Sequence, residues 1–112
     1  MLNAYATQFV VGEIFQERMN QDCKWGQQDH PDGTGPNVVS VIFPSDMAVR
    51  AKYARDICDN EHRNGRGNWM QILEEEVSEA FAEDDPQVLR RELIQVAAVA
   101  TAWVEAIDRR GS

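Results

Sequence analysis

The chain has 112 residues, 43% of them hydrophobic, which is enough for one small domain over residues 1–112 with a modest core. Its formal net charge of −8 repels nucleic-acid phosphates and argues against a nucleic-acid partner. No apolar stretch approaches the roughly 20 residues that span a bilayer, so we expect a cytoplasmic protein without a membrane partner. Two cysteines are too few for a disulfide scaffold.

The first predicted element is a helix from about Asn3 to Lys24, ending before Trp25 and Gly26. Apolar residues recur through this segment at helical spacing. They are Ala6, Val10, Val11, Ile14 and Phe15. This helical face is interpreted as core.

An irregular loop at about 25–44 follows, because glycine and proline interrupt any periodicity there. Lys24, Trp25 and His30 supply a cation, an aromatic platform and an imidazole, so they are candidate substrate-binding residues. Alternatively, Trp25 plugs the edge of the core and His30 merely starts a turn. The apolar run 38–43 is typical of a short extended strand, although no second strand is evident to pair with it.

A second helix is predicted from Ser45, as the N-cap, to about His62. The cations Lys52, Arg55, Arg63 and Arg66 on and after it either approach phosphates or are simply solvated. A competing metal pattern is a Cys₂His₂ zinc site made by Cys23, His30, Cys58 and His62. The gap from Cys23 to His30 is unusual for such a site.

A third helix is predicted from Trp69 to Glu83. At about 100° per residue, one apolar arc faces a core. It contains Trp69, Ile72, Leu73, Val77, Ala80 and Phe81. Glu76 falls inside this arc and Glu79 at its edge, whereas Glu74, Glu75 and Ser78 are predicted to point the other way.

The fourth predicted helix follows a break at Asp84–Pro86 and covers about 87–108. Asp85 is a suitable N-cap and Pro86 suits the first turn, and so short a connection makes the two helices an antiparallel hairpin. Glu92 lies inside the apolar arc of this helix and Gln95 at its edge. The remaining arc consists of Leu89, Leu93, Val96, Val99, Ala100, Trp103 and Ile107.

The two inward glutamates predict a metal site. A carboxylate turned into an apolar stripe loses hydration worth several kcal/mol unless something compensates it. No Lys or Arg lies three or four residues away inside either stripe. A hard cation such as Mg²⁺ compensates several carboxylate oxygens at once, and the alternative is a protonated or externally salt-bridged cluster.

The run Glu75-Glu76-Val77-Ser78-Glu79, followed by Glu92-Leu93-Ile94-Gln95, resembles the E-E-x-x-E and E-x-x-D signature of the MazG-like all-α nucleoside triphosphate pyrophosphohydrolases. The resemblance covers about 40 residues and implies metal ligands at Glu76, Glu79, Glu92 and Gln95, with Glu75 in support. Gln95 stands where the family usually has Asp, which removes one negative charge and keeps an oxygen donor. Among the catalytic residues implied are Glu75, Glu76, Glu79 and Glu92.

We therefore expect an all-α, four-helix bundle-like protomer whose last two helices carry the acidic motifs. The final helix is apolar on nearly every side, so a homodimer or a dimer of dimers is expected to bury it. The function that the resemblance implies is Mg²⁺-dependent hydrolysis of nucleoside triphosphates to monophosphate and pyrophosphate, with Mn²⁺ as a substitute ion. The alternative is a noncatalytic helical dimer on the same scaffold that binds a nucleotide or a protein partner.

Overall fold

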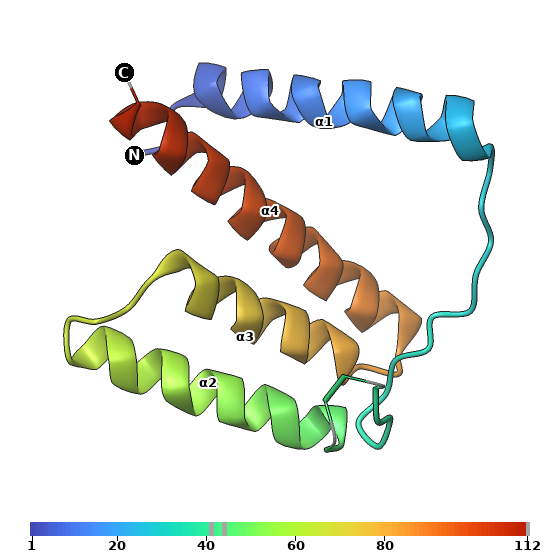
Figure 1. Cartoon of the computed structure of the whole chain (residues 1–112), viewed down its shortest axis with the longest axis vertical. Coiled ribbons are helices and arrows are strands. Elements are labelled where there is room, and N and C mark those ends of the chain that lie inside the picture. The colour runs from blue at the N-terminus through green and yellow to red at the C-terminus, as the bar shows by residue number, and fades with distance from the viewer. Residues whose placement is uncertain (41, 44, 112) are drawn as a thin grey trace. The chain divides into compact units, whose positions relative to one another are not determined.

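The computed structural model describes residues 1–40, 42–43 and 45–111, and all regular structure within them is helical. Figure 1 shows the four helices: α1 (Ala4–Trp25), α2 (Met47–Arg63), α3 (Trp69–Phe81) and α4 (Pro86–Arg110). The predicted all-α class is therefore confirmed. Of the predicted strand 38–43, residue 41 lies outside the described residues. Val39 forms only an isolated bridge with Asp46.

The chain divides into two compact units, and α4 belongs to both of them. One unit combines residues 1–32 with 100–112, and the other covers residues 33–99. The second unit contains α2, α3 and the first half of α4. It holds all the glutamates that the sequence singles out.

In the second unit α2 and α3 lie side by side and pack along their length (Figure 1). Met47, Ala51 and Cys58 on α2 are buried, as are Ser78 and Ala80 on α3. The three α2 residues lie within about 40° of one another around the helix, because each residue advances it by about 100°. They form a narrow buried seam along α2.

The starts of α3 and α4 are fixed by side-chain caps. The Asn68 side chain accepts a hydrogen bond from the Gln71 backbone N–H, and the Gln71 side chain accepts one from the Asn68 backbone, which makes a capping box. Asp85 accepts from the Gln87 backbone N–H at 2.9 Å, so the predicted cap of α4 is confirmed.

Predicted and observed helix ends differ by one or two residues, and the two ends that bound the long loop are examples. The N-cap of α2 is Asp46 rather than Ser45, and its side chain makes no capping hydrogen bond. At the other end of the long loop, Trp25 is the last residue of α1 rather than the first of the loop. Both differences are of the size expected for helix termini, which fray and are set by local hydrogen bonds.

The end of the long loop ties the C-terminal end of α3 to the N-terminal end of α2. The Gly35 N–H donates to the Phe81 carbonyl at 2.9 Å, and the Met47 N–H donates to the Val38 carbonyl at 2.9 Å. Gly35 is buried at φ 151°, where a Cβ would lie 3.3 Å from a Val38 methyl. Glycine is required here by both the backbone conformation and the space.

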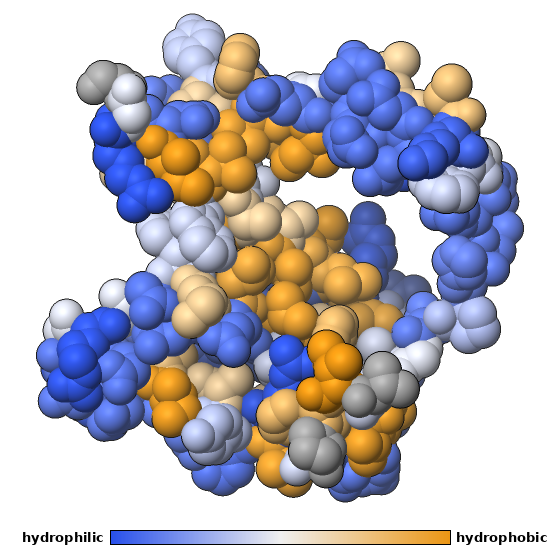
Figure 2. Space-filling model, in the orientation of Figure 1, coloured by the Kyte–Doolittle hydropathy of each residue, from blue (hydrophilic) through white to orange (hydrophobic). Residues whose placement is uncertain are grey.

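In the first unit, α1 meets the second half of α4 through a polar contact. The Thr7 hydroxyl donates to the Glu105 carboxylate at 3.0 Å, and Glu105 is buried. Most of α1 is exposed, including Tyr5, Phe9 and Phe15, so the predicted core face of this helix is buried only at Val10. Figure 2 shows apolar side chains gathered over the middle of α4. In the second unit, Leu93 and Ile94 of α4 are exposed.

Within the described residues, no helix is both long enough and apolar enough to cross a bilayer.

Candidate metal centre

Three glutamates from two helices converge in the second unit. Glu76 and Glu79 lie one turn apart on α3, and Glu92 lies in the first half of α4. One oxygen of each carboxylate lies within 4.8 Å of an oxygen of the other two. We call these three residues the acid trio. Oxygens that share one Mg²⁺ lie about 4 Å apart or closer, so small side-chain rotations bring the trio to an ion.

Two carboxylates of the acid trio have a buried oxygen that lacks a hydrogen-bond donor in the part of the chain that the structure describes. Glu76 and Glu92 each have one oxygen, Oε2, that is buried and has no hydrogen-bond partner among the described residues. Both side chains are half-buried. A buried carboxylate oxygen without a donor is unfavourable by at least the cost of a lost hydrogen bond, about 1–3 kcal/mol. The arrangement is costly unless a cation or a proton joins it.

Burial and mutual repulsion favour the protonated forms of two members of the trio. Burial, followed by the charge of Glu92, raises the pKa of Glu76. Burial, followed by the charges of Glu76, Glu75 and Glu92, also raises the pKa of Glu79, and the Arg55 guanidinium opposes that shift. The site therefore has an excess of negative charge that a divalent ion would neutralise.

Ser78 and Glu75 do not lie on a solvated face as the sequence arithmetic predicted. Ser78 is almost completely buried, with 1% of its surface exposed, because α3 packs against α2 on that side. Glu75 is half-buried and accepts a hydrogen bond from the Cys58 thiol. Phe81, predicted to face the core, is instead 39% exposed.

A cavity of about 300 Å³ opens beside the acid trio. Glu79, Glu83 and Glu92 form its acidic wall, and Arg55 of α2 is its cationic residue. The other lining residues are small or apolar: Pro36, Ala48, Ala51 and Ala82. The sequence left Arg55 equivalent to three other cations, because its place depends on how α2 packs against α3.

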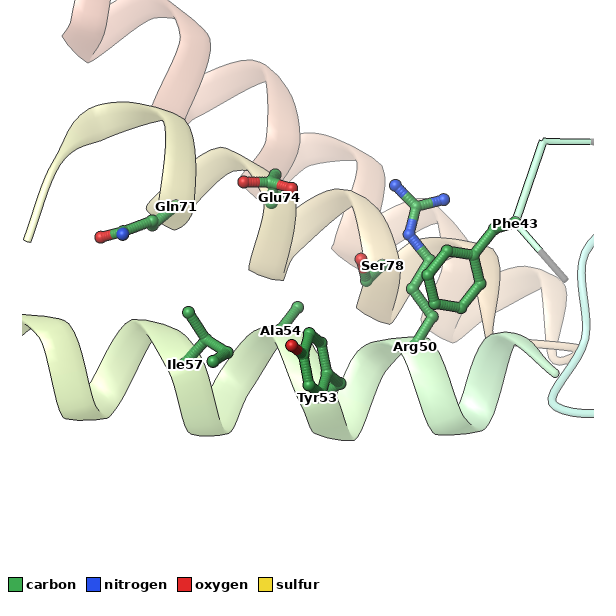
Figure 3. A pocket seen from close by; sticks show the side chains of 8 residues that line it. All are labelled: Phe43, Arg50, Tyr53, Ala54, Ile57, Gln71, Glu74 and Ser78. Carbon is green, nitrogen blue, oxygen red and sulfur yellow. The ribbon is translucent and has the colours of Figure 1, made fainter. Parts of the chain in front are cut away.

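A second cavity, of about 180 Å³, lies between α2 and α3 (Figure 3). It is lined by Phe43, Arg50, Tyr53, Ala54, Ile57, Gln71, Glu74 and Ser78. Around α2, the residues of the two cavities lie on opposite sides of the buried seam, by the rotation of about 100° per residue. The first cavity is called the acidic cavity below, and the second the aromatic cavity.

The other candidate residues are not part of this cluster. Lys24, Trp25 and His30 are exposed in the first unit, where the Lys24 ammonium lies 4.8 Å from the centre of the Trp25 ring. Their role in substrate binding stays a prediction. Gln95, one turn after Glu92, is exposed, and its predicted ligation is likewise untested.

The zinc alternative gains no support among the described residues. Burial, followed by the neighbouring Glu75, raises the pKa of the Cys58 thiol to about 11. The acid trio, which contains no Cys or His, is the metal-ligand cluster found within the described part of the chain.

Comparison with family models, with curated proteins and with solved structures finds no match to this chain. The features of the chain that bear on its function are therefore the acid trio, its cavity and the motif spacing.

Proposed function

We propose that this chain is a metal-dependent nucleoside triphosphate pyrophosphohydrolase that releases a nucleoside monophosphate and pyrophosphate. The observation that carries the proposal is the convergence of the acid trio within 4.8 Å, with buried unpartnered oxygens on Glu76 and Glu92. The same three positions match the acids of the MazG-like motif. The match between motif and geometry favours this family over other metal-binding proteins.

The ion in this proposal is Mg²⁺, with Mn²⁺ as a substitute. Carboxylate oxygens are the protein ligands that hard cations prefer, and Mg²⁺ completes its shell with water and substrate phosphates. The cluster offers three carboxylates, and Gln95 is the proposed fourth ligand. In this arrangement α3 and α4 act as the antiparallel hairpin that holds the ligands.

When bound, the ion supplies charge neutralisation for the phosphates and acidifies a coordinated water. Among the residues of the chain, Glu76, Glu79 and Glu92 hold and orient that ion. Glu75 is the proposed proton acceptor, because its charge acts on both Glu76 and Glu79 and its carboxylate therefore lies near the acid trio. A proton from the attacking water then moves to Glu75 or to a carboxylate of the trio.

The proposed assembly is a homodimer or a dimer of dimers. Large apolar residues are exposed on both α1 and α4, among them Phe9, Phe15, Leu93 and Ile94. Exposed apolar surface on several elements is typical of a protein that associates. The helix faces that carry these residues are the proposed contacts between copies.

The test is pyrophosphate release from a panel of ribonucleoside and deoxyribonucleoside triphosphates with Mg²⁺ or Mn²⁺. We expect Glu92→Gln to lower the rate about 100-fold or more, because the lost ion contact is worth several kcal/mol in the transition state. Glu74→Gln is the matched control, since Glu74 is an exposed glutamate that lines the aromatic cavity instead. Equal rates in wild type and Glu92→Gln would reject the site.

The second candidate is the noncatalytic helical dimer that binds a nucleotide or a protein partner. Gln95 favours it, because an amide in place of an acid weakens the hold on a divalent ion. The same assay separates the two functions, and Gln95→Asp is expected to raise the metal-dependent rate of an enzyme. No pyrophosphate from any triphosphate, in wild type or in Gln95→Asp, would leave the binding function.

A further inference from the structure

Two cations on the exposed side of α2 differ in what their charges face. The Lys52 ammonium forms an ion pair with the Asp56 carboxylate at 2.7 Å, one turn further along the same helix. Arg55 lines the acidic cavity together with Glu79 and Glu92. Among the described residues, no carboxylate lies within ion-pair distance of Arg55.

We infer that Arg55 binds a phosphate group of the metal-bound ligand in the acidic cavity. This inference rests on the proposed metal site and adds the residue that recognises the phosphate chain. An arginine fork donates two parallel N–H bonds, which match two oxygens of one phosphate. The Arg55 guanidinium lies across the cavity from the acidic wall and forms no ion pair with it. A polyphosphate between Arg55 and the bound ion would contact the ion with some of its oxygens and Arg55 with others.

The charge of the cavity selects the class of ligand. The chain carries a net charge of −8, and Glu79, Glu83 and Glu92 all line the cavity, so a small anion alone gains little there. A polyphosphate has enough oxygens to contact a divalent ion and an arginine together. The small side chains of Ala48, Ala51 and Ala82 leave the space for such a chain, within a cavity of about 300 Å³.

The experiment measures binding rather than turnover. Isothermal titration gives the affinity for Mn²⁺ alone, and then, at saturating Mn²⁺, the affinities for pyrophosphate and for a nucleoside monophosphate. Arg55→Ala is expected to leave Mn²⁺ affinity unchanged and to weaken at least one of the two phosphate ligands about tenfold or more. Loss of pyrophosphate affinity places the leaving group at Arg55, and loss of monophosphate affinity places the remaining phosphate there.

Lys52→Ala is the matched control, because it removes one positive charge from the same helix outside the cavity. It is expected to weaken neither ligand, and Arg55→Lys is expected to recover part of the lost affinity. The inference is overturned if Arg55→Ala changes neither phosphate affinity, or if Lys52→Ala causes the same loss. Equal weakening of Mn²⁺ itself by Arg55→Ala would also overturn it.

The proposed hydrolysis is tested separately, by measuring pyrophosphate release by the wild-type protein. Arg55-dependent pyrophosphate binding without any hydrolysis would uphold the inference and reject the enzyme. If hydrolysis is lost in Glu92→Gln but KM and kcat are unchanged in Arg55→Ala, the enzyme is upheld and the inference about Arg55 is rejected.

Discussion

Each of the two cavities beside the α2–α3 seam contains one arginine, and the surroundings of the two arginines differ. In the aromatic cavity, the Arg50 guanidinium lies 5.5 Å from the Phe43 ring centre and 5.4 Å from that of Phe81. In the acidic cavity, Arg55 shares the lining with carboxylates rather than with aromatic rings. Two aromatic faces hold Arg50 in place, which is typical of a structural cation, whereas Arg55 keeps its donors for a ligand.

These arginines are five positions apart on α2, which turns the helix by about 140°. Residue type alone therefore does not identify a functional cation. What distinguishes Arg55 is its position across from Glu79 and Glu92, and that position follows from the packing of α2 against α3.

The largest expected effect is on the seam between the cavities. Met47 is 1% exposed, so Met47→Ala leaves a hole and should lower the free energy of unfolding by about 2–5 kcal/mol. Urea denaturation followed by circular dichroism measures this loss. A loss below about 1 kcal/mol would mean that the two cavities are not held by a shared packed seam.

A smaller effect on the free energy of unfolding is expected from removing the charge of Glu76. The folded-state pKa of Glu76 is raised above its ordinary value of 4.5, so the folded protein favours the protonated form. In metal-free protein, the contribution of Glu76 to the free energy of unfolding is therefore fully present at low pH, and it is lost as pH rises through the folded pKa. Glu76→Gln removes this penalty and should raise the unfolding free energy by about 1 kcal/mol at pH 7.

The gain from Glu76→Gln should shrink as pH falls through the raised folded pKa and vanish below the ordinary value of 4.5, where the wild-type carboxyl is protonated in both states. Denaturation of metal-free protein at several pH values measures it, with Glu74→Gln as the control from the aromatic side. A variant that is less stable than wild type at neutral pH would show that the Glu76 carboxylate has a favourable partner.

The smallest effect is expected at the wall of the aromatic cavity. The Ser78 hydroxyl is buried, with no hydrogen-bond partner among the described residues. Ser78→Ala removes an unsatisfied polar atom and adds helix propensity, so the free energy of unfolding should stay constant or rise by up to about 0.5 kcal/mol. A loss above about 1 kcal/mol, in thermal unfolding, would indicate that the hydroxyl is satisfied in solution.

The sequence predicted the four helices and the inward placement of Glu76 and Glu92, because apolar periodicity and caps are local signals. It was wrong about Ser78 because the arithmetic assumed a single core-facing arc on α3. In the structure α3 packs against α2 through a different face from the one that carries Glu76. A helix between two neighbours buries residues that one arc does not contain.

The place of Arg55 was beyond sequence arithmetic for a related reason. A helical wheel gives directions around one axis, whereas the acidic cavity is made by side chains from α2, α3 and α4 together. Likewise, Glu75 looked solvated until Cys58 of the neighbouring helix was found beside it. The surroundings of such residues depend on contacts between helices, which no local sequence pattern predicts.

The reciprocal bonds between Asn68 and Gln71 set the rotational phase of every residue downstream. Because α3 is anchored at its first turn, deleting one residue between Gln71 and Glu76 would advance the rest of the helix by one position. Val77 and Ala80 would then stand where Glu76 and Glu79 stand now, and two of the three converging acids would be replaced by hydrocarbon. The spacing between the cap and the acids is as much a part of this centre as the acids themselves.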